Sequence, residues 1–186
     1  MNTIFTIGHS THSLEEFVDL LKGHGVARIA DVRSVPKSRR VPHFNAEVLR
    51  ESLRAAGIGF THIAALGGLR HSRKDSINTG WRNASFRGYA DYMATAEFAE
   101  GLNELMGLAR AEATATMCAE AVPWRCHRSL IADALTVKGW EVLDIVGAGP
   151  ATEHKLTSFL RVEEGKLTYP AEHEGPDLPL SFPINE

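Results

Sequence analysis

Five short runs of β-branched and other apolar residues alternate along this chain with longer amphipathic segments. The runs span residues 3–8, 28–32, 59–66, 114–118 and 141–146. Strands that alternate with helices pair in parallel, because each crossover helix returns the chain to the same end of the sheet. The pattern therefore predicts a single three-layer α/β domain, in which helices cover both faces of a mostly parallel five-stranded sheet.

The segments between these runs carry helix signals. Ser13 with Glu16 forms a capping box that opens a first helix, and Asn45 is expected to cap a second. Apolar residues at helical spacing predict one long helix over residues 89–110 and another after residue 129. Residues 69–87 show no regular period, so we expect a lid or a binding segment there.

The α/β pattern predicts one domain over residues 1–170 and a loosely held, acidic and Pro-rich tail over residues 171–186. The chain shows no secretion signal and no apolar run of membrane length. Its two cysteines are too few for a disulfide scaffold. We expect a cytoplasmic protein with reduced thiols and no membrane partner, and the pattern leaves the oligomeric state open.

Charge is distributed unevenly along the chain. Residues 28–87 hold 12 Lys and Arg against 4 Asp and Glu, whereas the remainder holds 8 against 19, which together give the net charge of −3. Such asymmetry is typical of a surface that meets phosphates or acidic partners, nucleic acid included. Arginines that are simply solvated on helices and loops would give the same counts, so both interpretations stay open.

Polar residues or glycines follow each predicted strand. In chain order they are His9 with Ser10, Asp31 with Arg33, Gly67 with Gly68, Cys118 with Glu120, and Gly147 with Gly149. Open parallel sheets bind ligands beyond the carboxyl ends of their strands. The sequence therefore predicts one site at this rim.

Residues 114–135 combine a strand, a short polar loop and the start of a helix. Cys126, His127 and Arg128 fall at the helix start, where unpaired N–H groups and the helix dipole favour a phosphate or carboxylate. Arg33, Arg39 and Arg128 could add bidentate contacts to the same anion. Anion binding is the simplest chemistry that this corner predicts.

A nucleophilic role for Cys126 is a second interpretation. A cysteine at a helix start beside His127 and Arg128 should have a lowered pKa and a larger thiolate fraction. Glu120 or His9 could then act as acid or base. Cys118, at the end of an apolar strand, fits a packing role better. The Cys-x5-Arg spacing of phosphatase-like loops is absent, so we do not predict a phosphatase.

A metal site is a third interpretation. Cys118, Cys126 and His127 would suit zinc or iron, with Glu120 or His9 as a further ligand. The chain has only two thiols and no Cys-x-x-Cys pair, so the pattern is weak. No cofactor follows from it.

These residues also carry a resemblance to a known family. Residues 2–168 resemble the domain-of-unknown-function family 488, and His154 is similar to a histidine found in that family past the last strand. The matching motifs are residues 7–10, 31–33 with Pro36, Ser38 and Arg39, 66–68, 86–93, and 118–128. The resemblance implies a Rossmann-like α/β domain whose motifs line one pocket. It implies no reaction, because the family is named for its unknown function.

The first hypothesis is an enzyme, or former enzyme, that acts on a phosphate-bearing ligand such as a nucleotide or nucleic-acid fragment. Its expected catalytic residues are Cys126, Glu120 and His9. Its expected ligand-binding residues are Ser10, Asp31, Arg33, Ser38, Arg39, Gly67, Gly68, Cys118, His127 and Arg128. One alternative is a non-catalytic nucleic-acid or anion-binding module. Another is a metal-dependent hydrolase that uses Cys118, Cys126 and His127.

Overall fold

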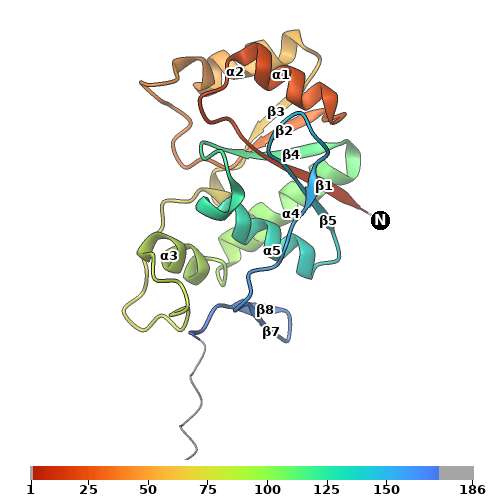
Figure 1. Ribbon diagram of the computed structural model, residues 1–186. Coiled ribbons are helices and arrows are strands. Elements are labelled where there is room, and N and C mark those ends of the chain that lie inside the picture. Colours follow the sequence, from red (N-terminus) through yellow and green to blue (C-terminus); the bar gives the residue numbers. More distant parts are fainter. Residues whose placement is uncertain (1, 172–186) are drawn as a thin grey trace, which may run out of the picture.

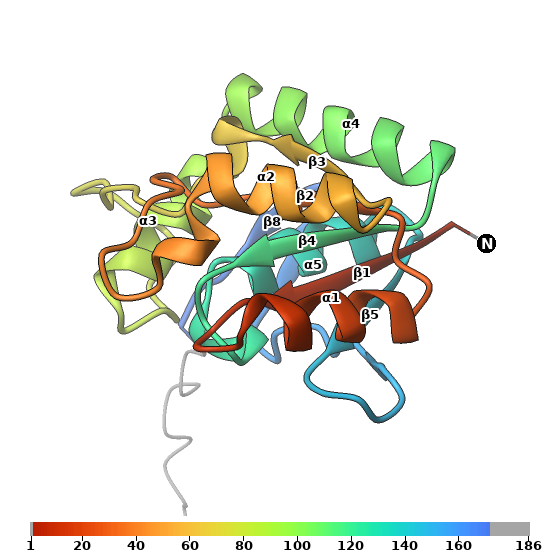
Figure 2. The ribbon, with the colours of Figure 1, turned by 90° about the horizontal axis from the view of Figure 1, so that it is seen from above.

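A six-stranded sheet forms the centre of the computed structural model, which describes residues 2–171. All of the predicted tail except Ala171 lies outside the described residues. The strand order is β3-β2-β4-β1-β5-β6, and the first five pair in parallel (Figure 2). The strands are β1 (Thr3–Gly8), β2 (Arg28–Asp31), β3 (Gly59–His62), β4 (Thr114–Cys118), β5 (Glu141–Ile145) and β6 (Thr152–Glu153).

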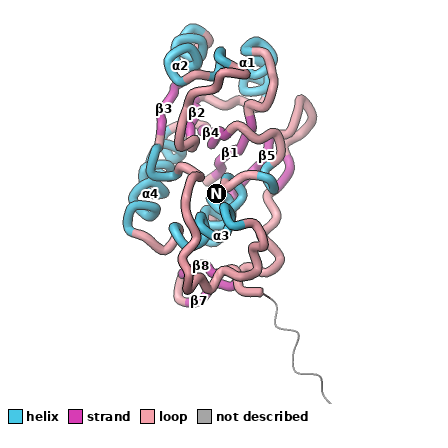
Figure 3. Tube along the Cα trace, turned by 90° about the vertical axis from the view of Figure 1, so that its left-hand side faces the viewer, coloured by secondary structure: helices cyan, strands magenta, loops and turns pink. Residues whose placement is uncertain are grey.

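Helices cover both faces of this sheet, which confirms the three-layer α/β prediction (Figures 1 and 3). On one face, α1 (Leu14–Gly23) and α2 (Ala46–Ala55) pack their apolar residues into one core. On the other face, α4 (Ala96–Ala111) and α5 (Arg128–Val137) build a second core. β1 serves both, because Ile7 belongs to the first core and Ile4 to the second. No helix in residues 2–171 has the length and apolar character needed to cross a membrane.

The helix predicted over residues 89–110 is wrong in one respect, because the structure divides it in two. The first part is α3 (Ala84–Tyr92), and the second is α4. Thr95 separates them, since its side chain accepts a hydrogen bond from the backbone N–H of Phe98 and so caps α4. Apolar residues continue at helical spacing across this break, which is why the sequence pattern suggests one helix.

The third predicted strand is shorter than expected. β3 ends at His62, and Ala64–Leu66 form a 3-10 turn. Tyr89 donates a hydrogen bond to the carbonyl of Leu66 at 2.9 Å, and Tyr92 donates one to that of Ala65 at 2.6 Å. The two tyrosines of α3 therefore hold the segment that leads to Gly67 and Gly68.

The structure also contains strands that the sequence pattern does not predict. β6 pairs antiparallel with β5 and extends the sheet from five strands to six. A separate hairpin of β7 (Arg161–Glu163) and β8 (Lys166–Thr168) lies beyond the helices of the second face (Figure 1). Its turn holds Glu164 and Gly165 at positive φ. These strands have only two or three residues each, too few to show a period of their own.

A buried carboxylate fastens this C-terminal region to α5. Asp133 accepts hydrogen bonds from His154 Nε2 at 2.8 Å, Thr157 Oγ1 at 2.7 Å and Tyr169 Oη at 3.0 Å. The other ring nitrogen of His154 lies 3.6 Å from the carboxylate of Asp144 on β5. Burial alone would lower the pKa of His154, but the hydrogen bonds to Asp133 and Asp144 raise it to about 9. The imidazole is therefore charged at neutral pH.

We predict that His154 makes folding stability fall as the pH rises from about 6.5 to 9. The raised pKa means that this contribution is complete below the unfolded value of 6.5 and is lost as the pH rises through about 9. His154→Gln should lose about 3 kcal/mol near pH 6 and progressively less toward pH 10. Urea unfolding of wild type and variant at several pH values measures the difference. His71→Gln, which changes an exposed histidine, is the control. A constant difference across this range contradicts the prediction.

Candidate functional site

Two neighbouring cavities lie at the carboxyl ends of β1, β2 and β4. Their volumes are about 410 and 440 Å³, and both are lined by Arg33, Val35, Ala119 and Glu120. We call the two together the rim cleft. The parallel register explains its position, because it sets Gly8 of β1 beside Cys118 of β4. Loops that leave neighbouring strands at the same level deliver their side chains to one place.

Four of the five predicted segments reach the rim cleft. The end of β1 contributes His9 and Ser10, and the loop after β2 contributes Arg33. The segment after β3 contributes Gly68, and the segment after β4 contributes Cys118 with Glu120, Cys126 and His127. The fifth prediction differs, because Gly147 lines a separate cavity beside α1. β5 pairs with β1 on the side away from β4, so its carboxyl end opens elsewhere.

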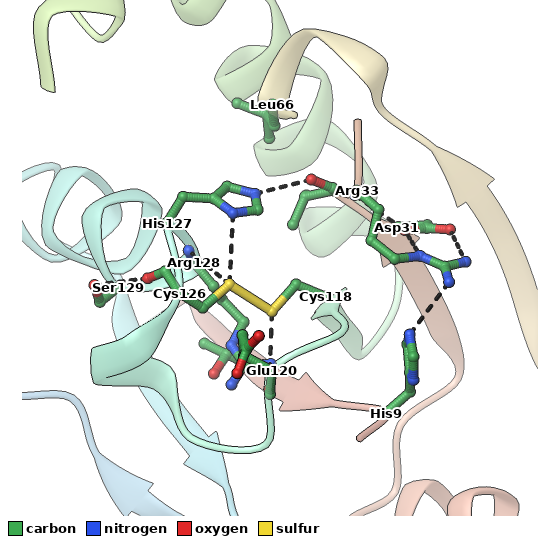
Figure 4. Close-up of a disulfide and its surroundings, with 12 residues drawn as sticks. His9, Asp31, Arg33, Leu66, Cys118, Glu120, Cys126, His127, Arg128 and Ser129 are labelled. Atoms are coloured by element: carbon green, nitrogen blue, oxygen red, sulfur yellow. Dashed lines mark hydrogen bonds and ion pairs between the residues drawn. A yellow bond between two sulfur atoms is a disulfide. The ribbon is translucent and has the colours of Figure 1, made fainter. Parts of the chain in front are cut away.

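Arg33 is held by a buried polar triad. Its guanidinium donates to both carboxylate oxygens of Asp31, with Nε–Oδ1 at 2.9 Å and Nη2–Oδ2 at 2.6 Å. Nη1 lies 3.2 Å from Nε2 of His9, whose Nδ1 lies 3.0 Å from the carbonyl of Ser10 (Figure 4). His9 also stacks on Phe44 with ring centroids 4.3 Å apart. Two rigid partners thus fix the direction of the Arg33 side chain.

The protonation of His9 follows from these contacts. Burial lowers the pKa of His9 to about 4, so the ring is neutral at pH 7. Arginine can only donate, so Nε2 is the acceptor and Nδ1 carries the proton given to Ser10. Both ring nitrogens are therefore engaged within the protein. His9 was predicted as an acid or base, and this geometry gives it the role of orienting Arg33.

Cys126 lies directly before α5, between two groups that can activate a thiol. His127 Nδ1 is 3.5 Å from the Cys126 sulfur, and the backbone N–H of Arg128 donates to the same sulfur at 3.5 Å. Nε2 of His127 donates to the carbonyl of Val32 at 2.9 Å, and burial lowers the pKa of His127 to about 4. The neutral ring therefore presents the lone pair of Nδ1 to the sulfur.

The structure joins the sulfurs of Cys118 and Cys126 as a disulfide, and neither cysteine is free (Figure 4). This corrects the expectation of two reduced thiols with separate roles. The loop between them turns back toward the end of β4, where the backbone of His9 bonds the carbonyl of Cys118 at 2.9 Å. A Cβ at Gly8 would collide with the carbonyl of Glu120, so only glycine allows the loop to pack there.

Arg128 carries an almost fully buried charge close to the rim cleft. Its side chain is 1% exposed, and none of its three guanidinium nitrogens has a hydrogen-bond partner among residues 2–171. It extends from the start of α5 toward Glu120 (Figure 4). Burial lowers the pKa of Arg128 to about 10, although the charges of Asp144 and Glu120 oppose this. The guanidinium thus stays charged at neutral pH, and hydrogen bonds to an oxyanion would stabilise it.

The lining of the rim cleft carries more positive than negative charge. Its cationic side chains are Arg33, Lys37, Arg40 and Arg125, and its one carboxylate is Glu120. Two of the predicted ligand-binding arginines, Arg39 and Arg128, line neither cavity, although the neighbours of Arg39 in the basic loop do.

The remaining predicted residues, Ser38, Gly67 and Gly68, lie in or beside the wall of the rim cleft. Ser38 lines one of its cavities, and its hydroxyl accepts a hydrogen bond from the backbone of Val41. A Cβ at Gly68 would collide with the imidazole of His127, and one at Gly67 would approach the hydroxyl of Ser34 to 2.6 Å. Gly68 is therefore required for His127 to pack this closely.

Several residues of the lining were not predicted from the sequence. Lys37, Arg40 and Arg125 belong to loops that were recognised as basic or reactive, so their charge was the available signal. Leu69, Ser85 and Phe86 come from the two ends of the irregular segment 69–87. That segment thus supplies part of the wall, as a binding segment would.

Metal ligands were a further prediction for this corner. Among residues 2–171, no group of three or more His, Cys, Asp or Glu side chains is arranged to hold a metal ion. Cys118, Cys126 and His127 lie close together, but the two sulfurs are bonded to each other. The metal-dependent hydrolase therefore stays a prediction without a ligand set in this part of the chain.

Comparison with protein families identifies one match. The model of the domain of unknown function DUF488 matches residues 13–135, which include Asp31, Arg33 and the whole Cys118–Arg128 corner. His9 and His154, part of the resemblance noted from the sequence, fall outside the matched range. No curated protein and no solved structure matches the chain. Because the matched range covers more than half of the sequence, the chain belongs to the DUF488 family.

Proposed function

We propose that the protein is an enzyme that binds a phosphate-bearing ligand in the rim cleft and attacks it with Cys126. The ligand class is a nucleotide or a fragment derived from nucleic acid. The observation that carries this proposal is the setting of the Cys126 sulfur, between His127 Nδ1 and the Arg128 N–H on the lining of a cationic cavity. The reaction belongs to the dithiol form, in which the bond to Cys118 is open.

The proposed first step is activation of the thiol. Neutral His127 accepts a hydrogen bond from the Cys126 thiol at Nδ1 and so orients it, its own N–H stays on the carbonyl of Val32, and the thiol proton is lost to solvent. The Arg128 N–H and the start of α5 stabilise the thiolate. The thiolate then bonds to the electrophilic centre of the ligand as the bond to the leaving group breaks, and the leaving group takes a proton from solvent water.

Charge supports the choice of a phosphate-bearing ligand. Arg33 is oriented by Asp31 and His9, so it can contact an anion without further ordering. Arg125 is exposed at the entrance beside Cys126. Arg128 lines neither cavity, but its backbone N–H donates to the Cys126 sulfur, and its buried guanidinium, which has no hydrogen-bond partner in the described part of the chain, adds positive charge nearby. An oxyanion in the cleft would meet the guanidinium groups of Arg33 and Arg125 and lie near the α5 start, a combination that favours phosphate.

We predict that Cys126 ionises below the pKa of about 8.5 of an ordinary thiol. In reduced Cys118→Ser, the alkylation rate of Cys126 by iodoacetamide should reach half its maximum at least one pH unit below that value. Reduced Cys126→Ser, which leaves only Cys118, is the matched control and should titrate at or above the ordinary value. A Cys126 profile centred on the ordinary value rules out the proposed nucleophile.

We predict that inorganic phosphate and a nucleoside monophosphate bind the reduced protein through Arg125. Arg125→Gln should weaken binding about tenfold, because a charge-assisted hydrogen bond contributes roughly 1.5–3 kcal/mol. Arg54→Gln on α2, whose side chain is 78% exposed, is the control and should bind like wild type. Isothermal titration calorimetry at low salt gives both affinities. Equal affinities in the two variants contradict an anion site in the rim cleft.

The same samples separate this proposal from a non-catalytic nucleic-acid module. Such a module would bind single-stranded DNA with an affinity that falls steeply with salt, through several phosphate contacts. It would show neither phosphate binding that depends on Arg125 nor a low pKa at Cys126. That pattern of results favours the module over the enzyme.

A further inference from the structure

Cys118 takes no part in the attack proposed above, yet its sulfur bonds to that of Cys126. Both cysteines line the same 410 Å³ cavity, so a molecule that enters can reach either. We propose that Cys126 and Cys118 form a dithiol–disulfide couple, which reduces low-molecular-weight disulfides that carry carboxylates. This activity does not depend on phosphate binding.

The surroundings of the two sulfurs assign their roles. Cys126 has an N–H donor from Arg128 and the lone pair of His127 Nδ1, both 3.5 Å away. Cys118 Sγ instead lies 3.9 Å from the carbonyl oxygen of Glu120, an acceptor that favours the protonated thiol. Cys126 is therefore the attacking thiol, and Cys118 is the resolving thiol that acts second.

The reaction balances in two exchanges. The Cys126 thiolate attacks one sulfur of the substrate disulfide, the substrate S–S bond breaks, and the first substrate thiolate leaves and takes a proton from solvent, which replaces the proton that Cys126 released. Cys118 then loses its proton and attacks the Cys126 sulfur, which releases the second substrate thiol and forms the Cys118–Cys126 bond. The substrate gains two electrons and two protons, and the protein dithiol loses them. Exchange with an excess of a small reduced thiol reverses the steps and restores the dithiol.

The lining of the cavity selects the substrate class. Val35, Leu69 and Phe86 supply apolar wall beside the sulfurs, while Arg33 and Arg125 supply positive charge. Glu120 is the one carboxylate on this lining. A disulfide whose flanking groups carry carboxylates matches these charges, whereas one with flanking ammonium groups would be repelled.

The experiment uses the full-length reduced protein with two probes, oxidised glutathione and cystamine. Wild type should convert oxidised glutathione to two molecules of reduced glutathione and end with a Cys118–Cys126 disulfide, found by mass spectrometry of peptides. Cys118→Ser should stop at a stable mixed disulfide on Cys126. Cys126→Ser should react at least about tenfold more slowly, because its remaining thiol lacks activation. Oxidised glutathione should react faster than cystamine.

Three results would overturn this inference. The wild-type protein could keep a mixed disulfide and never form the Cys118–Cys126 disulfide, a result that is detected without any variant. Cys126→Ser could react as fast as Cys118→Ser, or cystamine could react faster than oxidised glutathione. Loss of phosphate binding would leave the inference intact, so the two proposals fail separately.

Discussion

The parallel pairing of β1, β2 and β4, in a register that ends the three strands at nearly the same height, is the constraint on which the rest of the structure depends. It sets the last residues of these strands side by side, Gly8 next to Cys118 and Asp31 next to Met117. The absent side chain of Gly8 leaves room for the loop after β4 to lie across the end of β1. That loop carries Glu120 and returns the chain to Cys126 at the start of α5. The rim cleft therefore results from the register of the strands and from the close approach of the Glu120 backbone to Gly8.

Burial lowers the pKa of all three inner histidines, and the partners of each decide whether it prevails. His9 and His127 face an arginine, a sulfur or backbone carbonyls, so burial prevails and lowers the pKa of each to about 4. His154 lies between Asp133 and Asp144, and their charges raise its pKa to about 9. The molecule thus keeps neutral imidazoles at the rim cleft, where each orients a neighbouring side chain through hydrogen bonds without adding charge. It keeps a charged imidazole where two carboxylates must be neutralised.

The sequence predicted the order and type of the central strands because each is a buried, β-rich run bounded by glycine or polar residues. It also predicted which loops reach the rim, since parallel strands end at one edge. It could not place Gly147, because strand order within the sheet is a property of tertiary packing. The break at Thr95 was hidden by an apolar period that continues across it. β6 is fixed by its pairing with β5, and the segments on either side of the β7–β8 hairpin are fixed by the hydrogen bonds of Thr157 and Tyr169 to Asp133, which no local pattern records.

The side chains of the candidate site were only partly predictable. Residue type identified Cys126, His127, Arg33 and Glu120, but not the pairing of Cys118 with Cys126, whose spacing matches no common motif. The role of His9 depends on a hydrogen bond to a residue 24 positions away along the chain. The lack of hydrogen-bond partners around the Arg128 guanidinium, among the described residues, likewise depends on how distant segments pack and cannot be read from the sequence.

A crystal structure of the reduced protein, grown with inorganic phosphate, tests most directly whether these strand ends form an anion site around Cys126. The account predicts phosphate in the rim cleft, within hydrogen-bond distance of the guanidinium groups of Arg33 or Arg125 and beside an accessible Cys126 sulfur. A cleft without phosphate, with the Arg128 nitrogens satisfied by ordered water and the Cys126 sulfur closed off from solvent, would contradict it.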